Sequence, residues 1–295
     1  MVLTLPDADW SGQVAGLDAA ARTRALEEGA VLSFTRLAFP LSEAEQGLLR
    51  TDVAAPGHKN ISFDAARDRL AGVAGDAAQQ AAVHALLARY HETATRFVQG
   101  LVPHYRDVLQ HAPTSLRLFR TETRETSWRK DDSRLHVDAF PSRPNYGRRI
   151  LRVFTNISPL GEDRVWRVGD RFEAVARQML PRIRRMWPGE AAVLNALKVT
   201  KQPRSEYDHL MLGLHDAMKH DLDYQRDCPQ ETVRFPAGSV WVCFSDQVAH
   251  AAMSGQFMME QTYFLEAEHM AHPELSPLGV LERLKGKPLA PRVHA

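Results

Sequence analysis

The sequence predicts an α+β protein with a double-stranded β-helix (jelly-roll) core, N-terminal helices and a helical insertion. Three observations lead to this fold class. Alanine-rich segments with helical spacing dominate residues 1–112, strand-like segments dominate residues 113–270, and a second helical stretch interrupts the strands at about residues 172–224. Helices followed by strands with an insertion are typical of one layered core that carries additions.

We expect a single domain over residues 1–295. The chain has 295 residues and a hydrophobic content of 44%, which is enough to bury a substantial core. Residues 271–295 contain several prolines and basic residues, so we expect a loosely packed C-terminal tail.

The N-terminal helices are predicted from strong helix formers with apolar residues at helical spacing. They cover residues 17–28, 65–73 and 77–98, and residues 31–34 form a short strand between them.

The strands of the core are predicted from alternating or continuous apolar runs of strand length. They cover residues 115–124, 135–140, 150–157, 165–168, 240–244 and 261–265.

Two histidines and one aspartate form the most informative pattern. In an extended strand the side chains at i and i+2 share a face, so His136 and Asp138 can both point at one metal ion while Val137 points away. His250 follows a Pro-Ala-Gly-Ser turn and the apolar run 240–244, which is suited to bring it beside the first pair. Two imidazoles and one carboxylate that leave coordination positions open are the ligand set of non-haem Fe(II) oxygenases. The pattern therefore predicts an iron centre that uses O2.

Other neighbouring His and Asp residues are better explained as helix decoration. The pairs Asp208-His209, His215-Asp216 and His220-Asp221 all lie in residues 207–224, where apolar residues recur at helical spacing.

Longer blocks of the chain resemble the bacterial Kdo hydroxylase family. The resemblance lies in residues 134–144, 149–157, 164–169, 214–219 and 249–257. It implies an Fe(II)- and 2-oxoglutarate-dependent dioxygenase that hydroxylates C3 of 3-deoxy-D-manno-oct-2-ulosonic acid (Kdo). The resemblance further implies that the sugar is carried by a lipid A precursor, that the product is Ko, and that the reaction belongs to the assembly of the lipopolysaccharide inner core.

The far carboxylate of 2-oxoglutarate needs a cation or several hydrogen-bond donors. Many oxygenases place Arg or Lys on the strand after the distal histidine, but residues 251–265 contain neither, and Gln261 is among the polar residues available there. We expect Arg152, with Asn156 on the same face of its strand, to take this role. Arg149, of opposite parity, is a second candidate.

Basic residues cluster in sequence around the first two metal ligands. They can hold the carboxylates and phosphates of the substrate, and the alternative is that they are solvated loop charges. These residues are Arg129, Lys130, Arg143 and Arg148, while Lys201, Arg204 and Lys219 are candidates for a lid and Trp128, Tyr146 and Trp166 for stacking on a sugar.

The composition excludes some classes of function. A formal charge of +1 without a sustained basic block excludes a general nucleic-acid binder, and two cysteines indicate a reducing compartment. The N-terminus shows no export signal, and no apolar stretch is long enough to span a bilayer. We expect a cytoplasmic protein with at most peripheral contact at the cytoplasmic face of the inner membrane, and the sequence carries no signal for an oligomeric state.

Two alternative functions stay open at this point. One is a 2-oxoglutarate oxygenase of the same fold that acts on another small molecule or on a protein side chain. The other is a non-catalytic metal- or sugar-binding jelly roll in which the histidines hold Zn(II).

Overall fold

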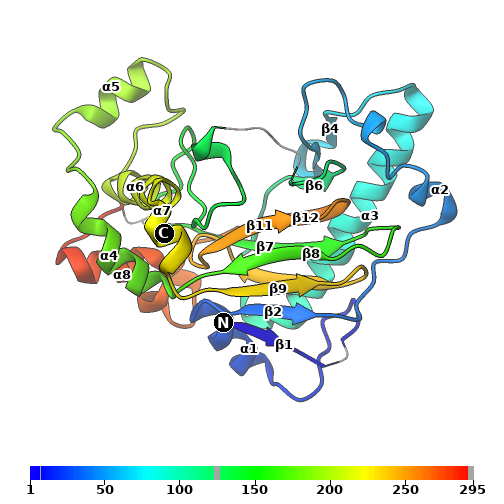
Figure 1. Cartoon of the computed structure of the whole chain (residues 1–295), viewed down its shortest axis with the longest axis horizontal. Coiled ribbons are helices and arrows are strands. Elements are labelled where there is room, and N and C mark those ends of the chain that lie inside the picture. Colours follow the sequence, from blue (N-terminus) through cyan, green and yellow to red (C-terminus); the bar gives the residue numbers. More distant parts are fainter. Residues whose placement is uncertain (7, 123–126, 292–295) are drawn as a thin grey trace.

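Two mainly antiparallel sheets packed face to face form the centre of the computed structural model, which describes residues 1–6, 8–122 and 127–291 (Figure 1). Within these residues the larger sheet has nine strands in the order β1-β2-β10-β7-β12-β6-β3-β4, and β5 also pairs with β12. The smaller sheet has the order β11-β8-β9. Only the pairing of β1 with β2 is parallel among the paired strands described.

The strands of the larger sheet come from both halves of the chain. They are β1 (Val2–Thr4), β2 (Val31–Phe34), β3 (Ile61–Asp64), β4 (Arg69–Ala71), β5 (Gln110–His111), β6 (Thr114–Arg117), β7 (Arg149–Asn156), β10 (Val240–Phe244) and β12 (Met258–Leu265). The smaller sheet consists of β8 (Arg164–Val168), β9 (Glu231–Phe235) and β11 (His250–Ser254).

Strand β10 shows why the central strands are apolar on both faces. Trp241 and Cys243 belong to the core between the two sheets, whereas Val242 and Phe244 belong to the core between the larger sheet and the N-terminal helices. All five residues of β10 are buried. A strand covered on both sides has no solvent-exposed face, which explains its continuous apolar run.

Three N-terminal helices accompany the larger sheet: α1 (Ala19–Glu27), α2 (Glu43–Gln46) and α3 (Ala77–Leu101). The long helix α3 packs against the outer face of this sheet (Figure 1). Its Tyr90 hydroxyl lies 2.9 Å from Thr155 Oγ1 of β7, so α3 is tied to the middle of the sheet by a buried hydrogen bond.

The helical insertion lies between β8 and β9 at one end of the sheets (Figure 1). It contains α4 (Phe172–Met179), α5 (Glu190–Ala196), α6 (Glu206–His220) and α7 (Leu222–Asp227). Helix α8 (Pro277–Lys285) packs against α4, and together with α6 they enclose a third core that includes Leu214 and Leu281.

The expected jelly-roll core with N-terminal helices and a helical insertion is confirmed, but the predicted C-terminal tail is wrong. The sequence predicted a loosely packed ending, whereas Leu281 of α8 is fully buried and Val280 is 5% exposed. Ser276 caps this helix by accepting from Gly279 N, and Gly286 ends it in the left-handed conformation.

The predicted helix at residues 65–73 is also wrong. Only Ala65–Arg67 form a short 3-10 turn, after which Asp68 adopts a left-handed conformation with φ of 46°. The chain then turns back as β4, and Leu70 pairs with Phe63 of β3. This hairpin sits at the edge of the larger sheet, where pairing outweighs the helix propensity of the alanines.

Two strand predictions need correction. The predicted strand at 115–124 is limited to β6, and its residues 123 and 124 lie outside the described part of the chain. The predicted strand at 135–140 is a single bridge between His136 and His250. Strand β9 was not predicted, because its exposed positions carry polar residues and it pairs along one edge only.

Candidate metal centre

His136, Asp138 and His250 converge at one end of the space between the two sheets. Their candidate ligand atoms all lie within 4.8 Å of one another, and the two imidazole rings are 4.7 Å apart between centroids. His136 Nε2 lies 3.7 Å from Asp138 Oδ1. The three side chains predicted from the sequence therefore form one group that can hold a metal ion.

Backbone pairing fixes these residues next to each other. His136 N donates to His250 O at 3.0 Å, and His250 N donates to His136 O at 2.9 Å. Asp138 N donates to Ser245 O at 2.9 Å, so the segment stays extended past the bridge. Three backbone hydrogen bonds are thus enough to place His136 and Asp138 on one face, without a regular strand.

Each imidazole is oriented by a carbonyl group on its far side. His136 Nδ1 lies 2.7 Å from Arg134 O, and His250 Nδ1 lies 2.8 Å from Val248 O. A nitrogen that faces a carbonyl carries the proton and donates it, which leaves Nε2 of both rings with a lone pair for a metal ion.

The protonation states also suit a metal site. Burial lowers the pKa of both histidines, so their neutral forms are favoured. Burial alone would raise the pKa of Asp138, but the Arg152 guanidinium and the two imidazoles hold it well below its usual value. Two neutral imidazoles and an ionised carboxylate are the forms that bind Fe(II) or Zn(II).

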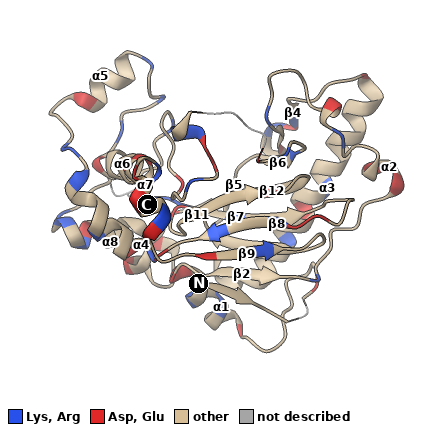
Figure 2. Cartoon of the chain, in the orientation of Figure 1, with Lys and Arg blue, Asp and Glu red and all other residues tan. Residues whose placement is uncertain are grey.

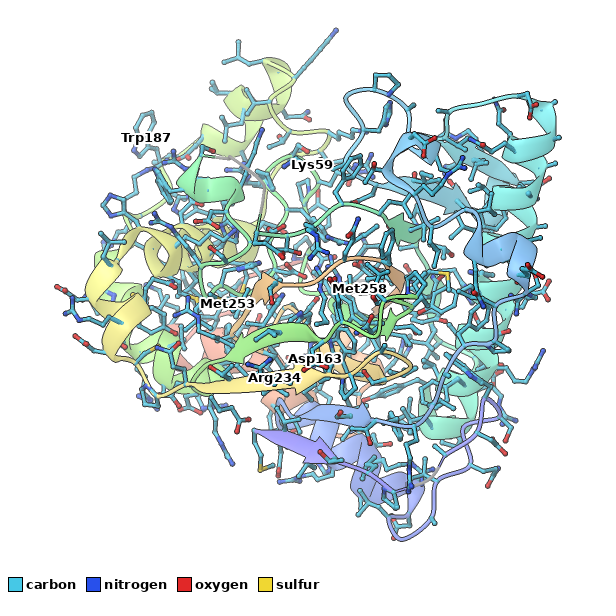
Figure 3. All side chains as sticks on the ribbon, turned by 45° about the vertical axis from the view of Figure 1, so that its right-hand side comes forward. Lys59, Asp163, Trp187, Arg234, Met253 and Met258 are labelled. Carbon is cyan, nitrogen blue, oxygen red and sulfur yellow. The ribbon has the colours of Figure 1, made fainter. Side chains whose placement is uncertain are left out.

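A small cavity of about 140 Å³ opens beside the three side chains. Arg117, Arg152, Arg164, Trp166 and Met258 are among its lining residues. Trp166 stacks on His250 with ring centroids 5.0 Å apart, which limits the movement of that imidazole. Met258 is buried, and Figure 3 labels it near the middle of the view.

Several polar atoms of the lining lack a hydrogen bond in the part of the chain that the structure describes. They are Asp138 Oδ2, Arg117 Nε, Arg152 Nε and Trp166 Nε1, each buried. Asp138 Oδ2 and Arg152 Nη2 are 3.2 Å apart, but their geometry gives an ion pair without a hydrogen bond. Three of these four atoms are N–H donors, and buried polar groups normally have partners, so this cavity fits a polar ligand that accepts hydrogen bonds.

Glu260 links two of the arginines. Arg117 Nη2 donates to Glu260 Oε2 at 2.6 Å, and Arg152 Nη1 lies 3.3 Å from Glu260 Oε1. Burial would raise the pKa of Glu260, but Arg117 and then Arg152 lower it, so the carboxylate stays ionised. Arg152 was predicted from the sequence as a residue of this site, whereas Arg117 and Arg164 were not, although Arg117 lies in a predicted alternating strand.

The other residues predicted to bind 2-oxoglutarate lie elsewhere. Arg149 is fully buried on the opposite face of β7, where it pairs with Asp246 at 2.8 Å. Asn156 Nδ2 donates to Glu162 O and Phe235 O, and Asn156 Oδ1 accepts from Ser158 N.

Gln261 faces α3 and bonds to His91 and Thr114. Arg149, Asn156 and Gln261 thus all bind other parts of the protein. Of the four residues predicted to bind 2-oxoglutarate, only Arg152 borders the metal cavity.

A second cavity of about 490 Å³, which we call the mouth, shares Arg117 and Arg152 with the first and therefore adjoins it. Arg143 and Arg148, two of the residues predicted to bind substrate, line this mouth. Arg148 lies over the Phe264 ring, 4.9 Å from its centroid.

Arg129 and Lys130 do not line the mouth. Arg129 pairs with Asp216 at 3.1 Å and borders a separate cavity of about 770 Å³, and Lys130 is exposed.

The lid candidates are fixed in different ways. Lys201 N donates to Ser142 O at 2.9 Å, and Arg204 donates to Pro141 O. Lys219 is buried and donates to Arg129 O at 3.1 Å, so it holds a loop and does not reach the mouth.

The aromatic residues predicted to stack on a sugar and the remaining histidines lie in different places. Trp166 borders the metal cavity, Trp128 borders the cavity of Arg129, and Tyr146 donates to Pro203 O at 2.8 Å. The His and Asp pairs of residues 208–221 lie on α6 or at its end, as predicted. His215 comes nearest the centre, with its ring 5.4 Å from that of His136.

A jelly-roll core with two histidines and one carboxylate beside a polar cavity defines the class of non-haem metal-dependent oxygenases. The family model of 3-deoxy-D-manno-oct-2-ulosonic acid (Kdo) hydroxylase matches residues 9–288. The chain therefore belongs to the Kdo hydroxylase family.

Solved structures agree with this assignment. The Kdo hydroxylase KdoO, a non-haem Fe(II) α-ketoglutarate-dependent dioxygenase, is 42% identical in its complex with α-ketoglutarate and Fe(III), with a TM-score of 0.91 over 98% of this chain and 97% of that chain. Its cobalt(II) complex gives 42% identity and a TM-score of 0.94 over 100% and 99%. Its complex with succinate and Fe(III) gives 41% identity and a TM-score of 0.92 over 100% and 99%. No curated protein sequence matches the chain.

Proposed function

We propose that this chain is an Fe(II)- and 2-oxoglutarate-dependent dioxygenase that hydroxylates C3 of Kdo on a lipid A precursor to give Ko. The observation that carries the proposal is the facing of the two imidazoles and Asp138 onto a small cavity lined by arginines, in a member of the Kdo hydroxylase family. When bound, Fe(II) with 2-oxoglutarate and O2 supplies the oxidation that converts C–H to C–OH and releases succinate and CO2.

The chain's own residues bind and orient the reactants. His136, Asp138 and His250 would hold the metal ion through His Nε2 atoms and a carboxylate oxygen. The guanidinium of Arg152, together with Arg117, is placed to receive the far carboxylate of 2-oxoglutarate, because both have buried donor atoms to spare. Trp166 and Met258 add apolar side chains to the lining beside these polar groups.

The mouth is suited to an anionic sugar. Arg143 and Arg148 line it beside Phe140 and Phe264, so a carboxylate meets positive charge while the sugar ring meets apolar surface. We assign these two arginines to the binding of the sugar and its anionic groups.

We further propose that the reaction takes place at the cytoplasmic face of the inner membrane, with the protein in peripheral contact, and that the chain acts as a single domain during assembly of the lipopolysaccharide inner core. No helix in the described ranges is long and apolar enough to cross a membrane. A sugar carried by lipid A is held at the bilayer surface, which is why we propose this contact.

One assay tests the function. Purified protein is incubated with Fe(II), ascorbate, 2-oxoglutarate and Kdo-lipid A, and succinate and the product mass are measured. We expect iron-dependent succinate release and a product heavier by one oxygen atom, with iron chelation as the control. Succinate without a Kdo product would indicate another target, and no iron-dependent succinate would indicate a non-catalytic Zn(II) or sugar site.

A further inference from the structure

A segment of the helical insertion differs in charge from the rest of the chain. Residues 181–204 contain six basic residues and one acidic residue, a net charge of +5, whereas the whole chain has +1. The basic residues are Arg182, Arg184, Arg185, Lys198, Lys201 and Arg204, and the acidic one is Glu190. Figure 2 shows basic positions on the chain that leads into and out of α5.

The same segment exposes large apolar side chains. Trp187 is 67% exposed, Val193 57%, Leu197 70% and Val199 50%. Among the described residues these are four of the seven exposed large hydrophobic side chains. Helix α5 projects away from the sheets in Figure 1, and Trp187 lies at the outer edge of the molecule in Figure 3. Scattered exposed hydrophobics are ordinary, but a group within one short segment marks an interaction site.

The segment is held in shape by its one acidic residue. Both oxygens of Glu190 accept from Arg184, at 2.5 and 2.7 Å, and Glu190 Oε2 also accepts from Trp187 N at 3.0 Å. The carbonyl of Arg184 in turn lies 2.8 Å from His209 Nε2 of α6. Glu190 therefore neutralises Arg184 and fixes the turn that presents Trp187, while it leaves the positive charge of Arg185, Lys198 and Lys201 unopposed within the segment.

We propose that the 185–201 surface, formed by Trp187, Val193, Leu197 and Val199 with Arg185, Lys198 and Lys201, docks on an anionic lipid bilayer. Exposed aliphatic and tryptophan side chains insert at the boundary between headgroups and acyl chains, and basic side chains around them bind anionic headgroups. Basic side chains in such a setting also bury their methylene stems in the apolar boundary. Charge of one sign beside an apolar group favours a bilayer over a protein partner, whose interfaces have fewer lysines at their centre.

The 185–201 surface is linked directly to the mouth of the candidate site. Lys201 N donates to Ser142 O at 2.9 Å, and Ser142 lines the mouth together with Pro141, to which Arg204 donates. A bilayer on this surface would therefore lie next to the mouth. The inference that docking presents the sugar of a lipid-linked substrate to the mouth rests on the proposed function, whereas docking itself does not.

Flotation with lipid vesicles tests the docking. The full-length protein is mixed with vesicles of phosphatidylethanolamine and phosphatidylglycerol, or of phosphatidylcholine alone, none of which contains Kdo. We expect the protein to float with the anionic vesicles only and to be released by high salt. Leu197→Ala and Trp187→Ala should weaken flotation, and the double change Lys198→Glu with Lys201→Glu should weaken it by roughly fivefold or more for each lysine removed.

Matched variants act as controls. Leu160→Ala changes a leucine of similar exposure, 63%, in the loop between β7 and β8, and Arg106→Glu with Lys285→Glu makes the same change of net charge elsewhere. These variants should float like the unchanged protein, and circular dichroism checks that all variants fold. The proposal is overturned if the unchanged protein does not float, if it floats equally with neutral vesicles, or if the control variants lose as much binding. Because no Kdo is present, a failed Kdo hydroxylation assay leaves this result unaffected, and the reverse also holds.

Discussion

Arg152 contacts a candidate metal ligand directly: its Nη2 lies 3.2 Å from Asp138 Oδ2. The same guanidinium lies 3.3 Å from Glu260 and borders both the metal cavity and its mouth. One side chain therefore connects the metal ligand, a buried carboxylate and the space for an anionic co-substrate. Its two carboxylate neighbours raise the pKa of Arg152 against the effect of burial, so it stays charged.

Replacing Arg152 should chiefly affect the use of 2-oxoglutarate. A hydrogen bond to a charged group contributes roughly 1.5–3 kcal/mol, so Arg152→Ala should raise the KM for 2-oxoglutarate by about tenfold to a hundredfold. Arg152→Lys should recover part of this loss, because it restores the charge without the forked geometry. Succinate release is measured against 2-oxoglutarate concentration. An unchanged dependence in the alanine variant would move the role to Arg117 or Arg164.

Changes to two of the proposed ligands, Asp138 and His136, should abolish turnover while the fold remains. Asp138→Asn keeps the shape but removes the negative charge, and His136→Ala removes an imidazole. We expect loss of iron-dependent succinate release and of cobalt(II) binding, followed by absorption spectroscopy, with an unchanged circular dichroism spectrum. His220→Ala, which alters an exposed histidine on α6, is the control and should keep both. Full activity in either ligand variant would refute the assignment.

Helix α8 should contribute to the stability of the whole chain. Leu281 is fully buried against the helical insertion, so Leu281→Ala removes buried methyl groups and leaves a cavity. Such changes lower the free energy of unfolding by about 2–5 kcal/mol. Denaturant unfolding measures this value, and Lys285→Ala at an exposed position of the same helix should change it by less than about 0.5 kcal/mol. Equal stabilities of the two variants would restore the prediction of a loose tail.

The metal ligands could be predicted from the sequence because their spacing reflects local geometry. His136 and Asp138 need only an extended backbone to share a face, and His250 follows an apolar run that has to be a central strand. The spacing holds although the segment around His136 is a bridge and no full strand. The prediction of the metal ligands depended on local alternation of side chains and not on the order of the strands.

The residues that line the metal cavity could not be predicted without knowing the order of the strands in the sheet. Arg117 and Glu260 meet because β6 pairs with β12, with Glu260 opposite Ser115 and Met258 opposite Arg117. No local pattern shows that two strands so far apart in sequence are neighbours. Likewise, alternation along the strand places Arg149 and Arg152 on opposite faces of β7. Only the structure shows that Asp246 and Gln247 contact Arg149 on its face.

Acid should loosen the turn that presents Trp187. The hydrogen bonds from Arg184, which outweigh the effect of burial, lower the pKa of Glu190 from 4.5 to about 2. Since the pKa of the folded state is depressed, Glu190 stabilises the turn fully above about pH 4.5, and this contribution is lost as the pH falls toward about 2. Hydrogen exchange of the Trp187 amide, which donates to Glu190, reports the loss directly.

In the variant Glu190→Gln the Trp187 amide should be less protected from exchange at neutral pH. After correction for the intrinsic exchange rate, its protection should no longer depend on pH over this range. The Val153 amide in β7 serves as the internal reference, because its protection depends on the sheet and not on Glu190. If the two proteins protect Trp187 equally at every pH, Glu190 does not hold the turn, and the exposure of Trp187 has to be set by the neighbouring Pro188 and Gly189 instead.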